Sequence, residues 1–214
     1  MKNLSITSRI NLLTVLTVAG LLIVLGLSLL KLNSVMQDEI ADRTRKTVEV
    51  AHSTVAHYQT MEQQGLLTRQ QAQTSALSAL EAMRYGDNDY FWVHDMQPRM
   101  VMHPFSKQLV GKDIGANTDA DGGLMFQEMN KVVRQSGEGF VHYQWAKPGQ
   151  NGSSPKVSYV KGFAPWGWVV GSGVYTDQIM AAVARAALGL GAMALLVAAL
   201  VAGAGWTMGR SITR

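Results

Sequence analysis

The stretch YFWVHDMQPRMVMHPF, residues 90–105, decides the fold, because two short alternating runs flank a turn at residues 96–99. Alternation of period two predicts two β-strands that each bury one face, and the proline between them is typical of a chain reversal. The stretch also contains one Trp and two His. Periodicity alone does not decide whether these rings fill a core or line a pocket, so the rest of the chain is needed.

The remaining sequence predicts a sheet with helices around it. Turns rich in Gly and Pro separate five expected strands, at residues 90–94, 100–103, 139–145, 156–163 and 168–174. We expect a long helix over residues 32–61, a second over 68–84 and a third that ends at Gly137. The fold class is therefore α+β, with an antiparallel five-stranded sheet whose connections gather on one face.

Two apolar runs lie near the ends of the chain. Residues 10–30 and 186–209 contain no charged residue over 21 and 24 positions. Each run is long enough to cross a hydrocarbon core of about 30 Å at about 1.5 Å per residue. A cleaved signal peptide is the alternative for the first run, but its apolar core would span about 7–15 residues, and LSLLKLNSV offers no Ala-x-Ala site. We expect two membrane spans.

The positive charges at the two ends predict how the chain is oriented. The sequence has 19 Lys and Arg against 15 Asp and Glu, and the excess of four is Lys2, Arg9, Arg210 and Arg214. The positive-inside rule then places both ends in the cytoplasm and residues 31–185 outside the inner membrane. The neutral middle argues against a nucleic-acid binder. Because the chain has no Cys, disulfides, thiolate catalysis and Cys-type zinc sites are excluded.

Five motifs in order resemble a known family, the small (single) Cache domain of bacterial transmembrane receptors. They are DYFWVHDMQPRMVMHPF, LVGKDI, GEGFVHYQWAKPG, KVSYVKGF and PWGWVVGSGVYTDQI. The resemblance implies a PAS-like sensor between two membrane helices that binds short organic acids such as acetate, propionate, pyruvate or C4 dicarboxylates. The most common output of such receptors is chemotaxis. The last six residues, GRSITR, are similar to the opening of a HAMP linker.

The resemblance and the apolar runs together predict the domain organisation. The expected order is a cytoplasmic N-terminus at 1–9, a first span at 10–30, a sensor domain at 31–185, a second span at 186–209 and the start of a HAMP linker at 210–214. Within the sensor domain we expect a long helix at 31–62 and a PAS-like core at 68–177. The apolar stripe of the long helix is too thin for one domain to bury, so we expect part of it to pack on a second copy in a homodimer.

A buried carboxylate needs a cation or donors beside it, and Lys161 is the predicted cation. In VSYVKGF this lysine shares strand parity with Tyr159 and Phe163, so an ammonium group and a phenol lie on one face. The alternative is a lysine that extends to solvent from an edge strand.

Four further residues complete the predicted ligand site. Arg84 could hold a carboxylate in bidentate fashion, or it could instead satisfy the end of the second helix. His103, Trp92 and Tyr143 are predicted to supply an imidazole, an indole N–H and a hydroxyl, with a packed core as the alternative for each. No metal or cofactor is expected, because His52 and His57 are five apart and do not share a helical face as an i, i+4 metal pair does.

The sequence favours a chemoreceptor over an enzyme, since no Walker A motif, nucleophile elbow or paired carboxylates occur. The ligand, a small carboxylate, is expected to close the pocket and shift the second span. Two alternatives stay open. The first is the sensor of a membrane histidine kinase or diguanylate cyclase, whose catalytic domain would lie beyond residue 214. The second is a membrane-anchored binding domain that does not signal.

Overall fold

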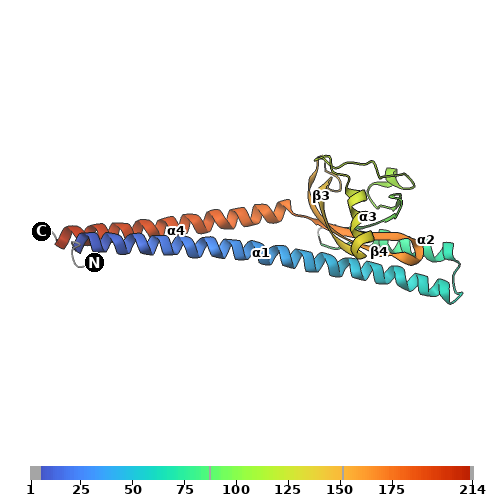
Figure 1. The fold of residues 1–214 in the computed structure, drawn as a ribbon, viewed down its shortest axis with the longest axis horizontal. Helices are drawn as coiled ribbons and strands as arrows, with labels where there is room; N and C mark the ends of the chain where they lie inside the picture. The colour runs from blue at the N-terminus through green and yellow to red at the C-terminus, as the bar shows by residue number, and fades with distance from the viewer. Residues whose placement is uncertain (1–5, 87, 151, 213–214) are drawn as a thin grey trace. The chain divides into compact units, whose positions relative to one another are not determined.

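The computed structural model describes residues 6–86, 88–150 and 152–212. Figure 1 shows helices at both ends of the chain and a small antiparallel sheet between them. The elements in chain order are α1 (Ile6–Gln63), α2 (Arg69–Ala82), β1 (Phe91–Asp95), β2 (Met100–Met102), the short helix η1 (Lys107–Leu109), α3 (Met125–Ser136), β3 (Glu138–Trp145), β4 (Ser154–Phe163), the short helix η2 (Ala164–Trp166), β5 (Trp168–Tyr175) and α4 (Asp177–Ile212). The predicted α+β class is confirmed.

The sheet is antiparallel throughout, with the strand order β2-β1-β5-β4-β3. The first and last strands are therefore neighbours, and β5 lies at the centre. All five expected strands are present, with ends that differ by one or two residues from the prediction. The chain leaves the central strand directly into α4, because only Thr176 separates them.

The helix ends follow local capping chemistry. Thr68 accepts a hydrogen bond from the backbone of Gln71, whose side chain accepts one from the Thr68 N–H in return, and this capping box starts α2. Gly137 ends α3 in the left-handed conformation, with φ 78°. The second helix ends at Ala82, two residues before the predicted end, so Arg84 lies outside it.

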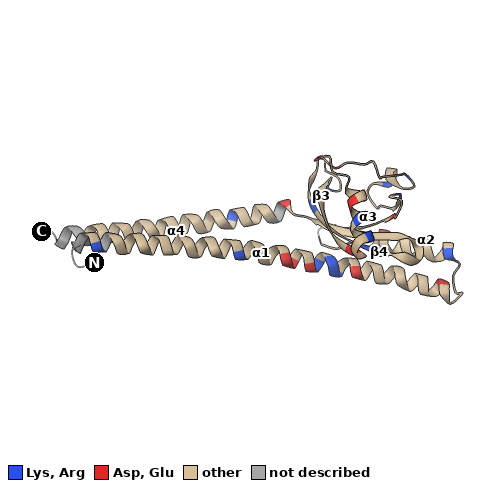
Figure 2. Ribbon diagram, viewed as in Figure 1, with Lys and Arg blue, Asp and Glu red and all other residues tan. Residues whose placement is uncertain are grey.

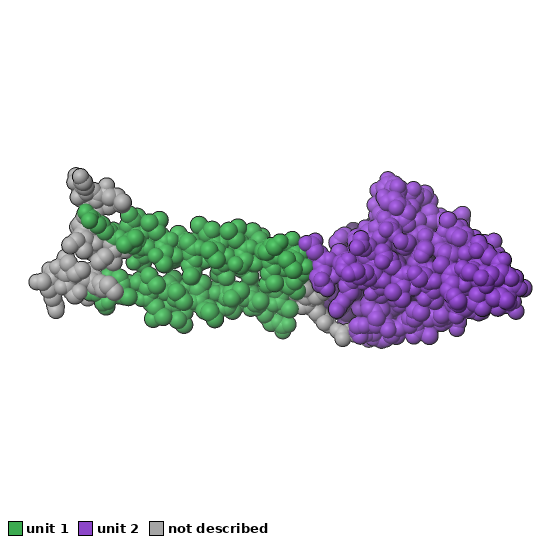
Figure 3. Space-filling model, turned by 90° about the horizontal axis from the view of Figure 1, so that it is seen from below, with its two compact units in different colours: residues 1–37, 178–214 green, residues 38–177 purple. Residues whose placement is uncertain are grey.

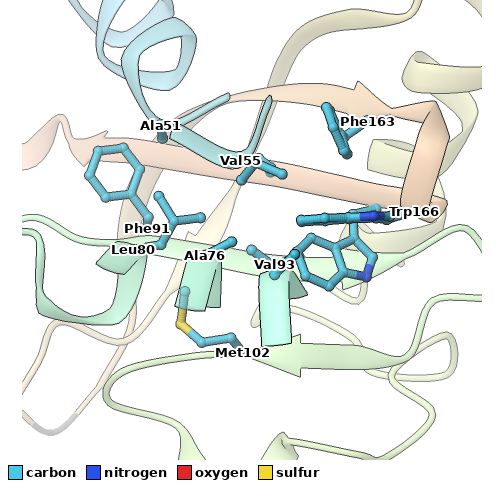
Figure 4. Close-up of a cluster of buried hydrophobic side chains, with 12 residues drawn as sticks. Ala51, Val55, Ala76, Leu80, Phe91, Val93, Met102, Phe163 and Trp166 are labelled. Atoms are coloured by element: carbon cyan, nitrogen blue, oxygen red, sulfur yellow. The ribbon is translucent and has the colours of Figure 1, made fainter. Parts of the chain in front are cut away.

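One face of the sheet, here called the α1 face, packs against α1 and α2. Its buried apolar residues include Val55 from α1, Leu80 from α2, Val93 from β1 and Phe163 from β4, and Figure 4 shows them converging. Leu80, Val93 and Val55 are fully buried. At roughly 25 cal/mol for each Å² of apolar surface removed from water, this cluster supplies much of the stability of the domain.

The opposite face, here called the α3 face, packs against α3 and the segment that leads to it. Its cluster includes Trp92 and Tyr143 from the sheet, Ile114 from the leading segment, and Phe126 and Met129 from α3. The sequence predicted that the connections between strands gather on one face. The long segment between β2 and β3 does lie on one face, the α3 face. The helices that precede the sheet cover the other face.

Two glycines keep the middle of β5 free of side chains on the α3 face. A Cβ at Gly171 would lie 2.4 Å from the Trp92 ring, and one at Gly173 would lie 2.0 Å from the Ser158 hydroxyl. Both distances are far shorter than van der Waals contact. The Trp92 ring and the Ser158 side chain therefore occupy the space above these two positions.

The chain divides into two compact units, coloured in Figure 3. One comprises residues 38–177, which include the sheet, and the other comprises residues 1–37 and 178–214. The second unit contains the apolar parts of α1 and α4, which Figure 2 shows as stretches with few charged residues. Within the described residues, two helices are long and apolar enough to cross a membrane, at Leu12–Gln63 and Met180–Thr207, with at most 6% of either apolar window buried. Lys2 and Arg214, on which the predicted orientation partly rests, lie outside the described residues.

Candidate ligand-binding site

A buried lysine lies on the α3 face, near the start of β4. Lys156 on β4 is paired between Tyr143 of β3 and Tyr175 of β5, and it is 2% exposed. Its Nζ donates to the Tyr90 hydroxyl at 3.1 Å. Nζ also lies 4.2 Å from the centroid of the Tyr90 ring, 4.7 Å from that of Tyr175 and 5.4 Å from that of Trp92. Three aromatic rings therefore surround one ammonium group.

The ion pairs in the described part of the chain include none between Lys156 and an acidic residue. Burial lowers the pKa of Lys156 to about 7, and the charge of Asp89 opposes this shift. A cation that is buried in this way is costly unless it is paired. The environment of Lys156 is therefore suited to receiving an anion.

His103 adds a neutral donor near this cation. Its Nδ1 accepts hydrogen bonds from the backbone N–H of Phe105 at 3.2 Å and of Ser106 at 2.8 Å. The proton of the neutral ring is then on Nε2, which donates to no described atom. Burial, followed by the charge of Lys156, lowers the pKa of His103 to about 3. The imidazole is therefore neutral near pH 7 and can donate one hydrogen bond through Nε2.

A cavity of about 390 Å³ opens beside His103. Tyr90, His103 and Trp145 form its inner wall, and the β3–β4 loop at residues 146–149 borders it from another side. The Tyr90 ring lies 4.9 Å from the His103 ring and its hydroxyl accepts from Lys156, so it joins the cavity to the buried cation. Tyr90 and Trp145, which are not among the predicted site residues, thus border the cavity.

Trp92 and Tyr143 lie on this face as predicted, but their polar atoms already have partners. The Trp92 Nε1 donates to His94 Nδ1 at 3.2 Å, so the indole N–H is not free for a ligand. The Tyr143 hydroxyl hydrogen-bonds with Ser158 Oγ at 3.0 Å. Both residues pack on this face, and the Trp92 N–H that was expected as a ligand donor is hydrogen-bonded to His94 instead.

Lys161 and Tyr159 are not brought together with the other predicted residues, because they point to the α1 face. Lys161 forms an ion pair with Glu138, its cross-strand neighbour, and its side chain is 27% exposed. The Tyr159 ring packs against Phe140 at 4.7 Å. The reason is strand parity, since Lys156 and Lys161 are five residues apart and must face opposite ways. The buried cation of the α3 face is Lys156, which sequence patterns did not single out.

Arg84 has the role that was given as its alternative, which is to satisfy the end of the second helix. Its guanidinium donates to the carbonyls of Glu81 at 2.7 Å and Met83 at 2.6 Å, at the end of α2. Its Cζ lies 5.1 Å from the ring of Phe105, which borders the cavity. Arg84 therefore contacts the rim of the cavity through Phe105.

A larger hollow of about 780 Å³ lies beside α3 and β3. Lys131, one of its cations, pairs with Glu128 at 3.1 Å on the exposed side of α3. Tyr143 lines this hollow, but Lys156 and His103 do not. The described residues include no group of three or more His, Asp or Glu that could hold a metal, and His52 contacts the Gly162 carbonyl instead.

The antiparallel sheet and the helices that cover its two faces have the fold of a Cache sensor. The chain belongs to the family described as Single Cache domain 2, whose model matches residues 36–188. The methyl-accepting chemotaxis protein McpP of Pseudomonas putida is 39% identical over all of this chain, which spans 39% of that protein's length. The sensor histidine kinase MctS of Rhizobium johnstonii is 32% identical over 56% of this chain and 26% of its own length.

Two solved structures are similar in sequence and fold. A periplasmic sensor domain of a chemotaxis protein is 46% identical, with a TM-score of 0.65, over 66% of this chain and 99% of that one. A second structure, described as the structural basis for carboxylic acid recognition by a Cache chemosensory domain, is 41% identical, also with a TM-score of 0.65, over 68% and 98%. The predicted family and PAS-like fold are confirmed.

Proposed function

We propose that this chain is the ligand-sensing and transmembrane part of a bacterial chemoreceptor that binds a small carboxylate. The observation that carries the proposal is the buried ammonium group of Lys156, which lies among three aromatic rings and has no ion pair with a described acidic residue. Carboxylic acid recognition by a similar Cache domain supports the ligand class.

The carboxylate would lie between Lys156 and His103. The ammonium group supplies a charge-assisted hydrogen bond, worth about 1.5–3 kcal/mol, and the His103 Nε2–H supplies a second donor. Rings of Tyr90 and Trp92 exclude water from the pair, which strengthens the attraction. We propose that the chain binds the acid without changing it.

The space at this position favours an acid of two to four carbons. Lys156 and Trp92 are 2% exposed, so a ligand that reaches the ammonium group must be small or must displace rings. A ligand of four heavy atoms gains at most about 6 kcal/mol, which corresponds to a dissociation constant of some tens of micromolar. Acetate, propionate, pyruvate and C4 dicarboxylates are the ligands that we expect, with C4 acids at the upper limit of size.

The route to the membrane begins at the loop that borders the cavity. The Tyr175 hydroxyl at the end of β5 donates to the Ala146 carbonyl at 2.7 Å. Lys147 in the same loop forms an ion pair with Asp177, the first residue of α4, at 2.7 Å. A ligand that moves this loop would therefore pull on the start of α4. Shifts of about 1–2 Å are typical of such helix switches, and only a ligand with different affinities for the two states can drive them.

We propose that residues 31–185 lie outside the inner membrane and that both ends of the chain are cytoplasmic, as the charges flanking the two apolar segments predict. The signal would continue from α4 into a HAMP linker that starts near residue 210. A homodimer along α1 stays part of the proposal, and it is supported by an outward side chain, Val50, which is 63% exposed.

A ligand panel tests the proposal directly. Thermal melts of the chain in detergent micelles are recorded with 1 mM of each C2 to C4 acid, and with amino acids, purines and sugars as controls. At a dissociation constant near 40 μM, ligand linkage stabilises the folded state by about 1.9 kcal/mol and raises the melting temperature by about 4–8 °C. The shift should shrink when the acid is replaced by its amide. Shifts with amino acids or purines, while every short acid leaves the melt unchanged, would overturn the ligand class.

A second candidate function is the sensor of a histidine kinase, which the similarity to MctS favours. Both candidates share the site and the ligand chemistry, and they differ only in the domains encoded beyond residue 214. Sequencing the gene past this point separates them, since a HAMP linker and a long heptad hairpin are expected of a chemoreceptor, and an ATP-binding catalytic domain of a kinase.

A further inference from the structure

Besides the Ser158 hydroxyl, two polar side chains among the described residues are completely buried on the α3 face and do not border the cavity. His94 on β1 and Asn130 on α3 each have an exposed fraction of 0%. Burial of such groups is costly unless every hydrogen bond is made, so residues of this kind are informative when they occur in a core.

The hydrogen bonds of these two residues form a chain with one possible direction. Since the indole Nε1–H of Trp92 can only donate, His94 Nδ1 accepts from it at 3.2 Å. The neutral imidazole then carries its proton on Nε2, which donates to Asn130 Oδ1 at 3.0 Å. The Asn130 Nδ2 donates to the Asp95 carbonyl at 3.1 Å. Burial lowers the pKa of His94 to about 4, so the ring stays neutral and keeps this pattern near pH 7.

This chain fixes the ring that lies against the buried cation. The Trp92 indole is 5.4 Å from Lys156 Nζ, and its other side covers the bare backbone at Gly171. Glycine at position 171 leaves room for the ring, but it supplies no side chain that would hold it. The hydrogen bond to His94 supplies that restraint, and Asn130 anchors His94 to α3.

We propose that His94 and Asn130 are positioning residues for the ligand site, which hold the Trp92 ring against Lys156 and thereby couple α3 to the ligand. The role in binding rests on the proposed function, whereas the restraint on Trp92 does not. Supporting residues of this kind keep a site in its productive geometry through the rotamers of the groups that contact the ligand.

The restraint can be measured without any ligand. The chain is labelled with 5-fluorotryptophan and studied by ¹⁹F NMR in micelles, with the Trp92 resonance assigned from Trp92→Phe. We expect Asn130→Leu to shift or split the Trp92 resonance and to leave those of Trp166 and Trp168, on the α1 face, unchanged. If the Trp92 resonance is unaltered, the inference is wrong.

The effect on binding is measured by calorimetry with propionate. We expect Asn130→Leu to weaken binding about tenfold, which corresponds to about 1.4 kcal/mol. In the Trp92→Phe background, which has no indole N–H, the same substitution should change the affinity less than twofold. Val55→Ala, a matched control in the α1-face core, should lower stability without changing either the affinity or the Trp92 resonance. Equal tenfold effects in both backgrounds would overturn the positioning role.

A conservative pair covers the case in which Asn130→Leu does not fold. His94→Gln keeps an amide acceptor and donor, whereas His94→Leu removes both. We expect His94→Gln to bind propionate within threefold of the unmodified chain and His94→Leu to bind it about tenfold more weakly. Equal affinities of the two variants would contradict the inference. If the unmodified chain binds no acid of the panel, the proposed function fails while the ¹⁹F measurement still decides the inference.

Discussion

The two lysines of β4 show how differently the two faces of one sheet are used. Lys161, on the α1 face, has a carboxylate partner in Glu138 and an exposed fraction of 27% for its side chain. Lys156, five residues earlier and on the α3 face, is 2% exposed and hydrogen-bonds to a phenol. On the α1 face the charge of Lys161 is paired with Glu138, whereas no acidic residue in the described part of the chain forms an ion pair with Lys156 on the α3 face.

The same contrast extends beyond the lysines. The buried polar residues on the α1 side, Thr44 and Ser172, carry hydroxyl groups, whereas the ionisable side chains of His94, His103 and Lys156, and the amide of Asn130, are buried on the α3 side. A sheet face that serves only stability has no need of buried ionisable groups. Buried polar and ionisable side chains on one face, and not the size of a hollow, therefore locate the candidate site.

The largest expected effect comes from removing the buried cation. Lys156→Met should weaken carboxylate binding by at least about thirtyfold, because losing one partner of a buried charge pair costs about 2–5 kcal/mol. The unliganded domain should be no less stable, since a desolvated charge is removed. Calorimetry of the chain with propionate measures the loss. Lys161→Met is the matched control and should stay within twofold; if Lys161→Met abolishes binding and Lys156→Met does not, the two faces have been assigned the wrong roles.

A substitution on the α1 face should have the opposite signature. Leu80→Ala removes a fully buried side chain and should lower the free energy of unfolding by about 2–5 kcal/mol. The dissociation constant for propionate should not change in conditions where the variant is folded. Denaturant titration measures the stability and calorimetry the affinity. A large loss of affinity in the folded variant would show that the two faces are coupled more closely than proposed.

The pH dependence should also separate the two faces. Lys156 has a pKa of about 7 in place of its ordinary 10.5, and a bound carboxylate favours the charged form. Binding is then coupled to proton uptake above pH 7, so affinity should fall by up to about tenfold per pH unit between about pH 7 and 9 and stay flat just below pH 7.

The stability of the unliganded domain should rise with pH, which is opposite to the change in affinity. Because the folded-state pKa of Lys156 is lowered, the unfolded chain binds more protons between about pH 7 and 10.5, and this group's contribution to stability rises with pH over that window. Both slopes should vanish in Lys156→Met. An affinity that is constant from pH 7 to 9 would contradict the assignment of Lys156 as the ligand cation.

The smallest expected effect concerns the link to α4. Lys147→Met removes the ion pair with Asp177, which is partly exposed and should contribute about 0.2–1 kcal/mol to stability. Ligand affinity should change less than threefold. A spin label at Met180→Cys, which is selective because the chain has no other Cys, should report a smaller ligand-induced change in this variant. An unchanged response would exclude this ion pair from the route of transmission.

Much of the fold follows from local sequence signals. Strand ends were predictable because Pro98, Gly137 and Gly149 interrupt alternating runs, and the start of α2 follows from the capping pair Thr68 and Gln71. These signals act within a few residues, so they do not depend on the tertiary structure.

The site was less predictable, because alternation separates two faces without saying which one receives the ligand. Lys161 was chosen since Tyr159 and Phe163 share its parity, yet these residues pack toward α1. Lys156 comes shortly after the turn-forming stretch KPGQNGSSP, two residues after β4 begins at Ser154, and therefore resembles a strand end. It is buried only because Tyr143 and Tyr175 lie on either side of it, and such long-range pairing is not encoded in local periodicity.

In the proposed receptor, the two glycines of β5 would allow recognition and transmission to evolve separately. Since Gly171 and Gly173 contribute no side chain to the α3 face, β5 contacts Lys156 through Tyr175 at its end, and the shape of the rest of the site depends on neighbouring strands, through residues such as Trp92 and Ser158. Substitutions at those neighbours can alter which acid fits, and the central strand, which continues into α4, keeps its sequence. A receptor lineage built on this sheet can therefore acquire new ligands while retaining one inherited connection to its membrane helix.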